Sequence, residues 1–134
     1  MTTQPDTRGR AAAATIFVCT TCRRKRADRP EGYDLPGVGL AAALAEEILR
    51  QGLAELTVIP VACLAVCRRP CTVAFAAPGK WTHLVGDLDA DAHVADIVAT
   101  ALAVARSEDG IVPWVERPQS IKSGGLARVP PLGS

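Results

Sequence analysis

The stretch Leu56-Thr-Val-Ile-Pro-Val-Ala-Cys-Leu-Ala-Val-Cys-Arg-Arg-Pro-Cys-Thr-Val-Ala-Phe75 joins two runs rich in β-branched residues through three evenly spaced cysteines. The first run predicts a strand over residues 56–61, and the second predicts a strand over residues 71–76. The cysteines form a C-x-x-x-C-x-x-x-C motif, which consists of Cys63, Cys67 and Cys71. This stretch therefore predicts a sheet with thiols on the connection between two of its strands.

A second group of cysteines follows another short apolar run. Cys19 and Cys22 form a C-x-x-C motif in Phe17-Val-Cys-Thr-Thr-Cys-Arg23, and residues 15–18 predict a buried strand that ends there. Thiolates that converge from two strand ends can form a four-sulfur metal site. Two cysteine groups, each placed after a strand, indicate such a site better than one C-x-x-C motif alone.

The remaining pattern completes an α/β fold. Residues 35–51 and 89–106 have apolar side chains at helical spacing, and Pro78-Gly79-Lys80 predicts a tight turn before a strand over residues 81–85. The element order is then β-α-β-β-β-α, and its first three elements predict a right-handed parallel crossover. This order is typical of a thioredoxin-like fold with a four-stranded mixed sheet and helices packed on it.

Composition divides the chain into three parts. Residues 1–14 are largely polar at their start and predict a disordered N-terminal segment. Residues 15–106 hold the periodic elements and both cysteine groups, so they form the predicted metal- or cluster-binding domain. Residues 107–134 are rich in Pro, Gly and Arg and predict an extended C-terminal tail.

Charge and hydropathy exclude several classes of partner. The chain of 134 residues has 15 Lys and Arg against 14 Asp and Glu, which indicates neither nucleic-acid binding nor an anionic membrane surface. No apolar run approaches the roughly 20 residues that span a bilayer. The apolar residues 11–18 continue into the first cysteine motif without a cleavage signal, so we expect a cytoplasmic protein and no signal peptide. Five cysteines, an odd number, do not suggest a disulfide scaffold there.

Three interpretations of the cysteines stay open on the residues alone. An iron–sulfur cluster suits two groups of thiolates from two loops, and the arginines beside both groups favour the thiolate form and the reduced cluster. Structural zinc also uses cysteine pairs, although its second pair is commonly C-x-x-C. Dithiol redox chemistry at Cys19 and Cys22 would make the protein an oxidoreductase. No long helix follows Cys22, however, so we expect no helix N-terminus beside this motif.

Other polar residues have simpler explanations. His83 and His93 can in principle replace a thiolate, but an isolated histidine on a strand or in a helix is usually a packing residue. Asp87, Asp89 and Asp91 lack the glycine and distant glutamate of a calcium loop, so they predict helix capping.

The cysteine-bearing segments resemble those of a known group of proteins. Residues 61–75, followed by Pro78-Gly-Lys-Trp-Thr-His-Leu-Val-Gly-Asp-Leu88, are similar to the C-terminal half of thioredoxin-like 2Fe-2S ferredoxins. Residues 15–131 as a whole resemble a family of small bacterial predicted metal-binding proteins, which have both cysteine motifs and end in a segment like Ala127-Arg-Val-Pro-Pro131. The resemblance implies a 2Fe-2S cluster. Members are often encoded beside cobalamin-synthesis and cobalt-uptake genes, which implies a link to that metabolism.

The resemblance also implies which residues act and with whom. It assigns Cys19, Cys63 and Cys67 as cluster ligands. Cys22 corresponds to the fourth ligand in its role but not in its spacing. Cys71 is either a buried thiol or the fourth ligand in place of Cys22, and five thiols leave a 4Fe-4S cluster open. The protein would be an electron carrier or redox sensor, and no enzyme, with a transient redox partner protein. Because thioredoxin-like ferredoxins are commonly dimers, a homodimer is also implied.

Overall fold

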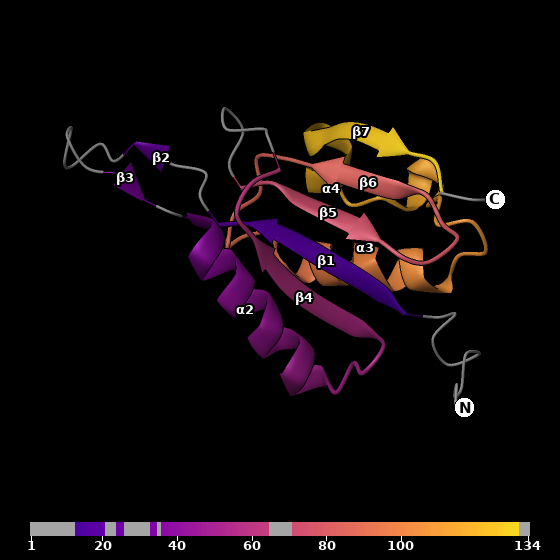
Figure 1. Ribbon diagram of the computed structural model, residues 1–134, viewed down its shortest axis with the longest axis horizontal. Helices are drawn as coiled ribbons and strands as arrows, with labels where there is room; N and C mark the ends of the chain where they lie inside the picture. The colour runs from indigo at the N-terminus through magenta and orange to yellow at the C-terminus, as the bar shows by residue number, and fades with distance from the viewer. Residues whose placement is uncertain (1–12, 21–23, 26–32, 35, 65–70, 132–134) are drawn as a thin grey trace.

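The computed structural model describes residues 13–20, 24–25, 33–34, 36–64 and 71–131. Its elements are, in chain order, β1 (Ala14–Cys19), β2 (Arg24–Lys25), β3 (Tyr33–Asp34), α2 (Pro36–Gln51), β4 (Leu56–Val61), β5 (Val73–Ala76), β6 (Thr82–Val85), α3 (Val94–Arg106), η1 (Trp114–Glu116), α4 (Gln119–Gly124) and β7 (Gly125–Val129). Figure 1 shows the larger strands side by side. No helix in the described ranges is long and apolar enough to span a membrane.

A five-stranded mixed sheet, in the order β4-β1-β5-β6-β7, forms the centre of the molecule. β1 and β4 are parallel and are joined through α2, as the β-α-β pattern predicts. β5, β6 and β7 add antiparallel strands. The α/β class and the mixed sheet are therefore confirmed, whereas the expected number of four strands is wrong, because β7 adds a fifth.

The extra strand comes from the segment that was expected to be an extended tail. Residues 107–131 instead include η1, α4 and β7, and β7 pairs with β6 along the sheet edge. Ile121 of α4 is buried in the core, and the Gly86 N–H donates to the Gly124 carbonyl at 2.8 Å. A side chain at Gly124 would clash with the Gly86 carbonyl, so glycine permits this close approach.

At the other end of the chain, β1 begins at Ala14, which is buried, one residue before the expected strand start. Residues 1–12 of the predicted disordered segment lie outside the described residues. Farther along the chain, β2 and β3 pair as a short antiparallel ladder.

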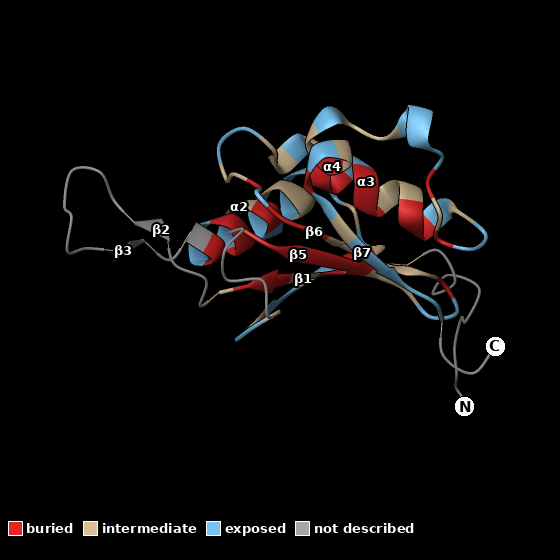
Figure 2. Cartoon of the chain, turned by 90° about the horizontal axis from the view of Figure 1, so that it is seen from above, coloured by how far each residue is buried: buried red, intermediate tan, exposed pale blue. Residues whose placement is uncertain are grey.

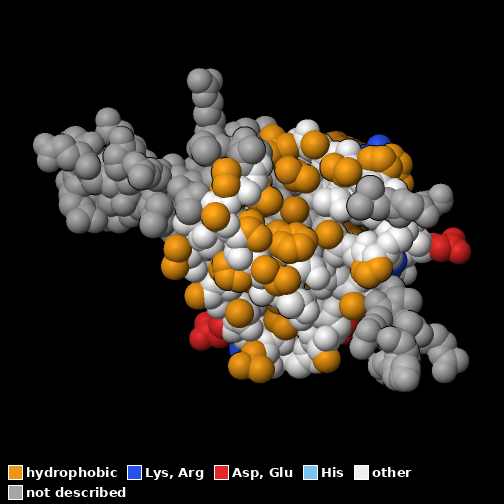
Figure 3. Space-filling model, viewed as in Figure 1, with side chains coloured by type: hydrophobic (Ala, Val, Ile, Leu, Met, Phe, Trp, Pro, Cys, Tyr) orange, Lys and Arg blue, Asp and Glu red, His pale blue; other side chains and the backbone are white. Residues whose placement is uncertain are grey.

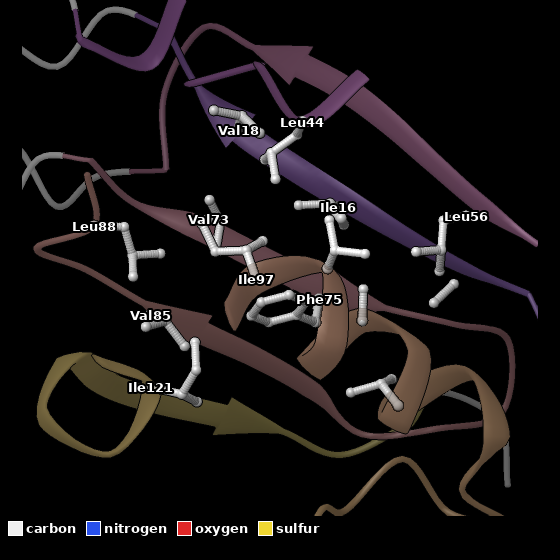
Figure 4. Packing of buried hydrophobic residues seen from close by; sticks show 14 of the residues in the cluster. Ile16, Val18, Leu44, Leu56, Val73, Phe75, Val85, Leu88, Ile97 and Ile121 are labelled. Atoms are coloured by element: carbon white, nitrogen blue, oxygen red, sulfur yellow. The ribbon is translucent and has the colours of Figure 1, made fainter. Parts of the chain in front are cut away.

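The core lies between the sheet and the helices. Figure 2 shows α2, α3 and α4 on the same side of the sheet, with buried residues where the two layers meet. Strand alternation directs Ile16 and Val18 of β1, and Phe75 of β5, toward this side, where α3 contributes Ile97. Figure 4 shows these apolar side chains gathered in one cluster. Burial of this single layer of aliphatic residues is the main stabilising contribution to the fold.

A buried lysine connects the β5–β6 turn to the end of α3. Gly79 adopts a positive φ of 72° in this turn, which directs the next residue back toward the helix. Lys80 Nζ then donates to the carbonyls of Val104 and Ala105, at 3.2 and 2.5 Å. A cation at carbonyls near a helix C-terminus complements the negative end of its dipole.

Among the residues that the structure describes, the opposite face of the five-stranded sheet carries no helix and no charged strand residue. One register row crosses all five strands, and the residues in it are Ile59, Phe17, Ala74, Leu84 and Ala127. The neighbouring row consists of Thr57, Thr15, Ala76, Thr82 and Val129. Figure 3 shows hydrophobic side chains gathered over the middle of this face. We call the two rows together the open face.

Candidate metal centre

Among the described residues, the chain at Cys19 of the first group and at Cys63 of the second lies at one edge of the sheet. Cys19 is the last residue of β1, and its register partner on the parallel strand β4 is Val61, the last residue of that strand. The N–H and the hydroxyl of Thr20 both donate to the Val61 carbonyl, at 2.9 and 3.0 Å. Because parallel strands end at the same edge, the chain leaves β4 toward Cys63 beside the point where it leaves β1.

The start of β5 lies on the other side of Cys19. The Cys19 N–H donates to the Thr72 carbonyl at 3.1 Å, which places the residue after Cys71 beside the end of β1. Cys71 exchanges two backbone hydrogen bonds of 3.1 Å with Leu88. Backbone pairing thus brings the chain at Cys19, Cys63 and Cys71 to one edge, as the sequence predicts for two strand ends.

The three described cysteines differ in their surroundings. Cys63 is exposed, whereas Cys19 and Cys71 have no exposed surface. The Cys19 thiol donates a long hydrogen bond of 3.9 Å to the Ala62 carbonyl, so it points toward the residue before Cys63. Cys71 belongs to the hydrophobic core cluster, and Cys19 does not. Cys19 is therefore oriented toward the β4 connection, while Cys71 is packed among apolar side chains.

The other two predicted ligands, Cys22 and Cys67, lie outside the described residues, as do Arg23, Arg26 and the arginines at 68 and 69. Within the described ranges, no group of three or more His, Cys, Asp or Glu side chains is close enough to hold a metal ion. The complete ligand set therefore stays a prediction.

The first turn of α2 packs directly against the backbone of Cys19. A Cβ atom added at Gly37 would lie 1.7 Å from the Cys19 carbonyl oxygen, so only glycine allows the helix to approach this closely. The positive end of the helix dipole consequently lies at the cysteine-bearing edge. The expectation that no helix N-terminus lies beside the first motif is wrong, because the helix arrives from 14 residues after Cys22. The sequence feature that could have indicated this contact is Gly37, a glycine in the first turn of the helix just after Pro36.

Each histidine makes a hydrogen bond to the backbone through one of its ring nitrogens. His83 Nε2 donates to the Gly110 carbonyl at 2.6 Å, and His93 Nδ1 accepts the Asp89 N–H at 3.0 Å. The Asp89 carboxylate accepts the N–H groups of Asp91 and Ala92, at 2.9 and 2.8 Å. Asp89 thus caps a turn, and α3 begins at Val94, five residues later than expected.

Comparison with known families places the chain. A family model described as "Protein of unknown function (DUF1636)" matches residues 16–131, which include both cysteine motifs and all of the sheet from Ile16 onward. The chain belongs to this family. None of the curated proteins matches it in sequence. The family description assigns no activity, so the resemblance to metal-binding proteins stays a prediction.

Solved structures confirm the fold of this DUF1636 protein. One match is a structure of a thioredoxin-like [2Fe-2S] ferredoxin from Aquifex aeolicus. It covers 91% of this chain and 97% of the ferredoxin chain, with a TM-score of 0.58 and 18% identity. A 1.5 Å crystal structure of the wild-type thioredoxin-like [2Fe-2S] ferredoxin from Aquifex aeolicus also matches. The match covers 86% of this chain and 97% of the ferredoxin chain, with a TM-score of 0.55 and 17% identity. At this identity the match establishes the thioredoxin-like ferredoxin fold and nothing about the cofactor.

The contact at Gly37 generates a first prediction, with a matched control on the same helix. Gly37→Ala should lower the free energy of unfolding by about 1–3 kcal/mol, the usual cost of overpacking, because the added methyl group meets the Cys19 carbonyl. Gly39→Ala should raise it by about 0.5–1 kcal/mol, because the methyl group meets nothing within 4 Å and alanine favours the helix. Urea denaturation measures both, and equal stabilities would contradict the close approach.

A second prediction concerns pH. Burial lowers the pKa of His83 below 6.5, and the guanidinium groups of Arg117 and Arg128 add to the effect, although the Gly110 carbonyl and Asp109 oppose it. As the pH falls below 6.5, the unfolded chain takes up a proton at His83 before the folded protein does. Stability should therefore fall on acidification through this range, and His83→Gln should reduce the fall. Urea denaturation at pH 7.5 and 5.0 tests this; an unchanged fall in the variant would refute it.

Proposed function

We propose that this protein holds a 2Fe-2S cluster at the edge where β1 and β4 end, and that it transfers single electrons to and from a protein partner. The observation that carries the proposal is the Cys19–Val61 register pairing, which ends two parallel strands together, each followed by cysteines. The fold likeness to thioredoxin-like [2Fe-2S] ferredoxins supports it. An electron carrier needs no catalytic residues, and the partner contact is small and transient.

The donor set fits such a group in number and chemistry. Four thiolates from two loops are the usual ligands of a 2Fe-2S cluster, and the chain supplies Cys19 and Cys22 from one loop and Cys63 and Cys67 from the other. The packing of Cys71 within the apolar core supports a structural role for that thiol. When bound, the cluster supplies a reversible one-electron couple.

The surroundings of Cys19 suit a negatively charged group. The N-terminal end of α2 lies against the Cys19 backbone, and its partial positive charge complements a negatively charged centre. Complete burial of Cys19 keeps water away from one side of the centre. On the family resemblance alone, we propose a link to cobalamin or cobalt metabolism.

Metal analysis of protein purified without air tests this proposal against its two rivals. The wild type should contain iron and acid-labile sulfide in equal amounts, about two of each per chain, and should absorb broadly in the visible range. Cys19→Ser and Cys63→Ser should lose most of both. Cys71→Ala is the matched control and should retain them.

The alternatives give different results in the same samples. Stoichiometric zinc in a colourless wild-type protein would replace the proposal with a structural zinc site. Disulfide reductase activity that disappears in Cys19→Ser, in protein without iron, would replace it with a dithiol oxidoreductase. Loss of iron in Cys71→Ala but not in Cys63→Ser would overturn the ligand assignment.

We also propose that two copies associate through the open face. The open face has no charged residue in either row, so it can pack against the same face of a second copy. Pairing two such faces buries no unpaired charge. Ile59 and Val129 on this face are 40% and 47% exposed, so apolar surface is available there. An isologous pair of this kind is the commonest symmetry among soluble oligomers.

Substitution on this face should dissociate the dimer. Light scattering after size exclusion should give twice the chain mass of 14.0 kDa for the wild type and a single chain mass for Ile59→Asp. Leu49→Asp is the control, because Leu49 is an exposed apolar residue on α2, away from the sheet. A monomeric wild type, or a Leu49→Asp variant that also dissociates, would count against the open face as the interface.

A further inference from the structure

A cavity of about 460 Å³ lies between the β6–β7 part of the sheet and the helices α3 and α4. Its volume falls within the range of small-molecule sites in proteins, roughly 300–1,000 Å³. Much of its wall comes from the C-terminal segment, including Trp114 of η1 and residues 125–128 of β7. None of its lining residues is a cysteine, so it is separate from the proposed cluster site.

The inner part of the cavity is apolar. Phe75, Val85 and Ile121 line it and belong to the hydrophobic core, and Figure 4 shows Phe75 beside α3 and Val85 next to Ile121. At the rim, Trp114 is 58% exposed, and the ring of Phe75 lines the inner wall. Aromatic side chains in the wall favour contact with another aromatic ring. The inner wall and rim therefore suit a ligand with an apolar, preferably planar, body.

The ionisable residues at the rim are all basic. His83, Arg117, Lys122 and Arg128 line the cavity, and no Asp or Glu does. Two cations are oriented by the exposed ring, because the Arg117 guanidinium and the Lys122 ammonium lie 5.6 and 5.4 Å from the Trp114 centroid. Arg117 Nε also donates to the Val112 carbonyl at 2.8 Å. Held in place around an apolar cavity, these groups favour a negatively charged ligand.

A buried hydroxyl group in the wall has no partner. Thr100 is 5% exposed, and its Oγ1 is the only buried side-chain N or O atom in the described ranges that makes no hydrogen bond. Buried polar groups are nearly always hydrogen-bonded, and an exception in a native structure calls for an explanation. Because Thr100 lines the cavity, a polar atom of a bound molecule can satisfy it.

From these observations we infer that the cavity binds a small organic anion with a planar apolar body, such as an aromatic carboxylate. The apolar body occupies the space beside Phe75 and Ile121, a polar atom meets Thr100, and the anionic group lies at the rim near Lys122 and Arg128. This site goes beyond electron transfer, and its test does not depend on metal content.

Isothermal titration calorimetry with 2-naphthoate tests the inference on the full chain as purified. Its neutral analogue, 2-naphthalenemethanol, keeps the ring system and removes the charge. We expect one naphthoate per chain, bound about tenfold or more tightly than the alcohol. Lys122→Met and Arg128→Met should each weaken naphthoate binding about threefold to tenfold, as cations at a partly desolvated site do. Arg50→Met, which removes an exposed cation on α2, is the matched control and should leave it unchanged.

Thr100→Val separates a binding role from a structural one. Valine has the same shape without the hydroxyl group, so the variant should be at least as stable as the wild type in urea. It should bind 6-hydroxy-2-naphthoate, whose hydroxyl group can meet Thr100, severalfold more weakly than the wild type does, without weakening the binding of 2-naphthoate, which has no second polar group. Three results would overturn the inference. They are no saturable naphthoate binding, equal affinity for the alcohol, or a loss in Arg50→Met as large as in Lys122→Met.

Discussion

The parallel pairing of β1 with β4 is the constraint on which the rest of the structure depends. It makes both strands end at one edge, and the hydrogen bonds from the N–H and the hydroxyl of Thr20 to the Val61 carbonyl hold those ends together. The helix between the two strands returns to the same place, where Gly37 lets its first turn rest on the Cys19 carbonyl. One strand pair thus fixes a thiol, the start of the second cysteine group and a helix N-terminus around a single point.

Local sequence pattern was sufficient for the elements around this edge. The strand predicted over residues 56–61 has the same bounds as β4. The predicted end of the first long helix, at Gln51 before Gly52, is also the observed end of α2. The common end of β1 and β4 followed from the β-α-β rule, which applies wherever two such strands share a sheet. The contact at Gly37 could not be predicted in this way, because it depends on the distance between a helix and a strand that are not adjacent in sequence.

The structure of the C-terminal segment could not be predicted from the local sequence pattern. Gly125-Leu-Ala-Arg-Val129 has neither a β-branched run nor strict alternation, and becomes a strand because the free edge of β6 is available to it. The six-residue helix α4 is too short to show a period, and burial of Ile121 stabilises it. Tertiary packing therefore determines this segment, which both completes the sheet and builds most of the basic cavity.

The account predicts one inorganic centre at the common end of β1 and β4, held by sulfur atoms from both loops. Anomalous scattering at the iron absorption edge, from crystals of anaerobically purified protein, locates iron without assuming any ligand. The account predicts a strong peak between the Cys19 and Cys63 sulfur atoms. A peak that touches only one cysteine group, or none at this edge in protein shown to contain iron, would contradict it.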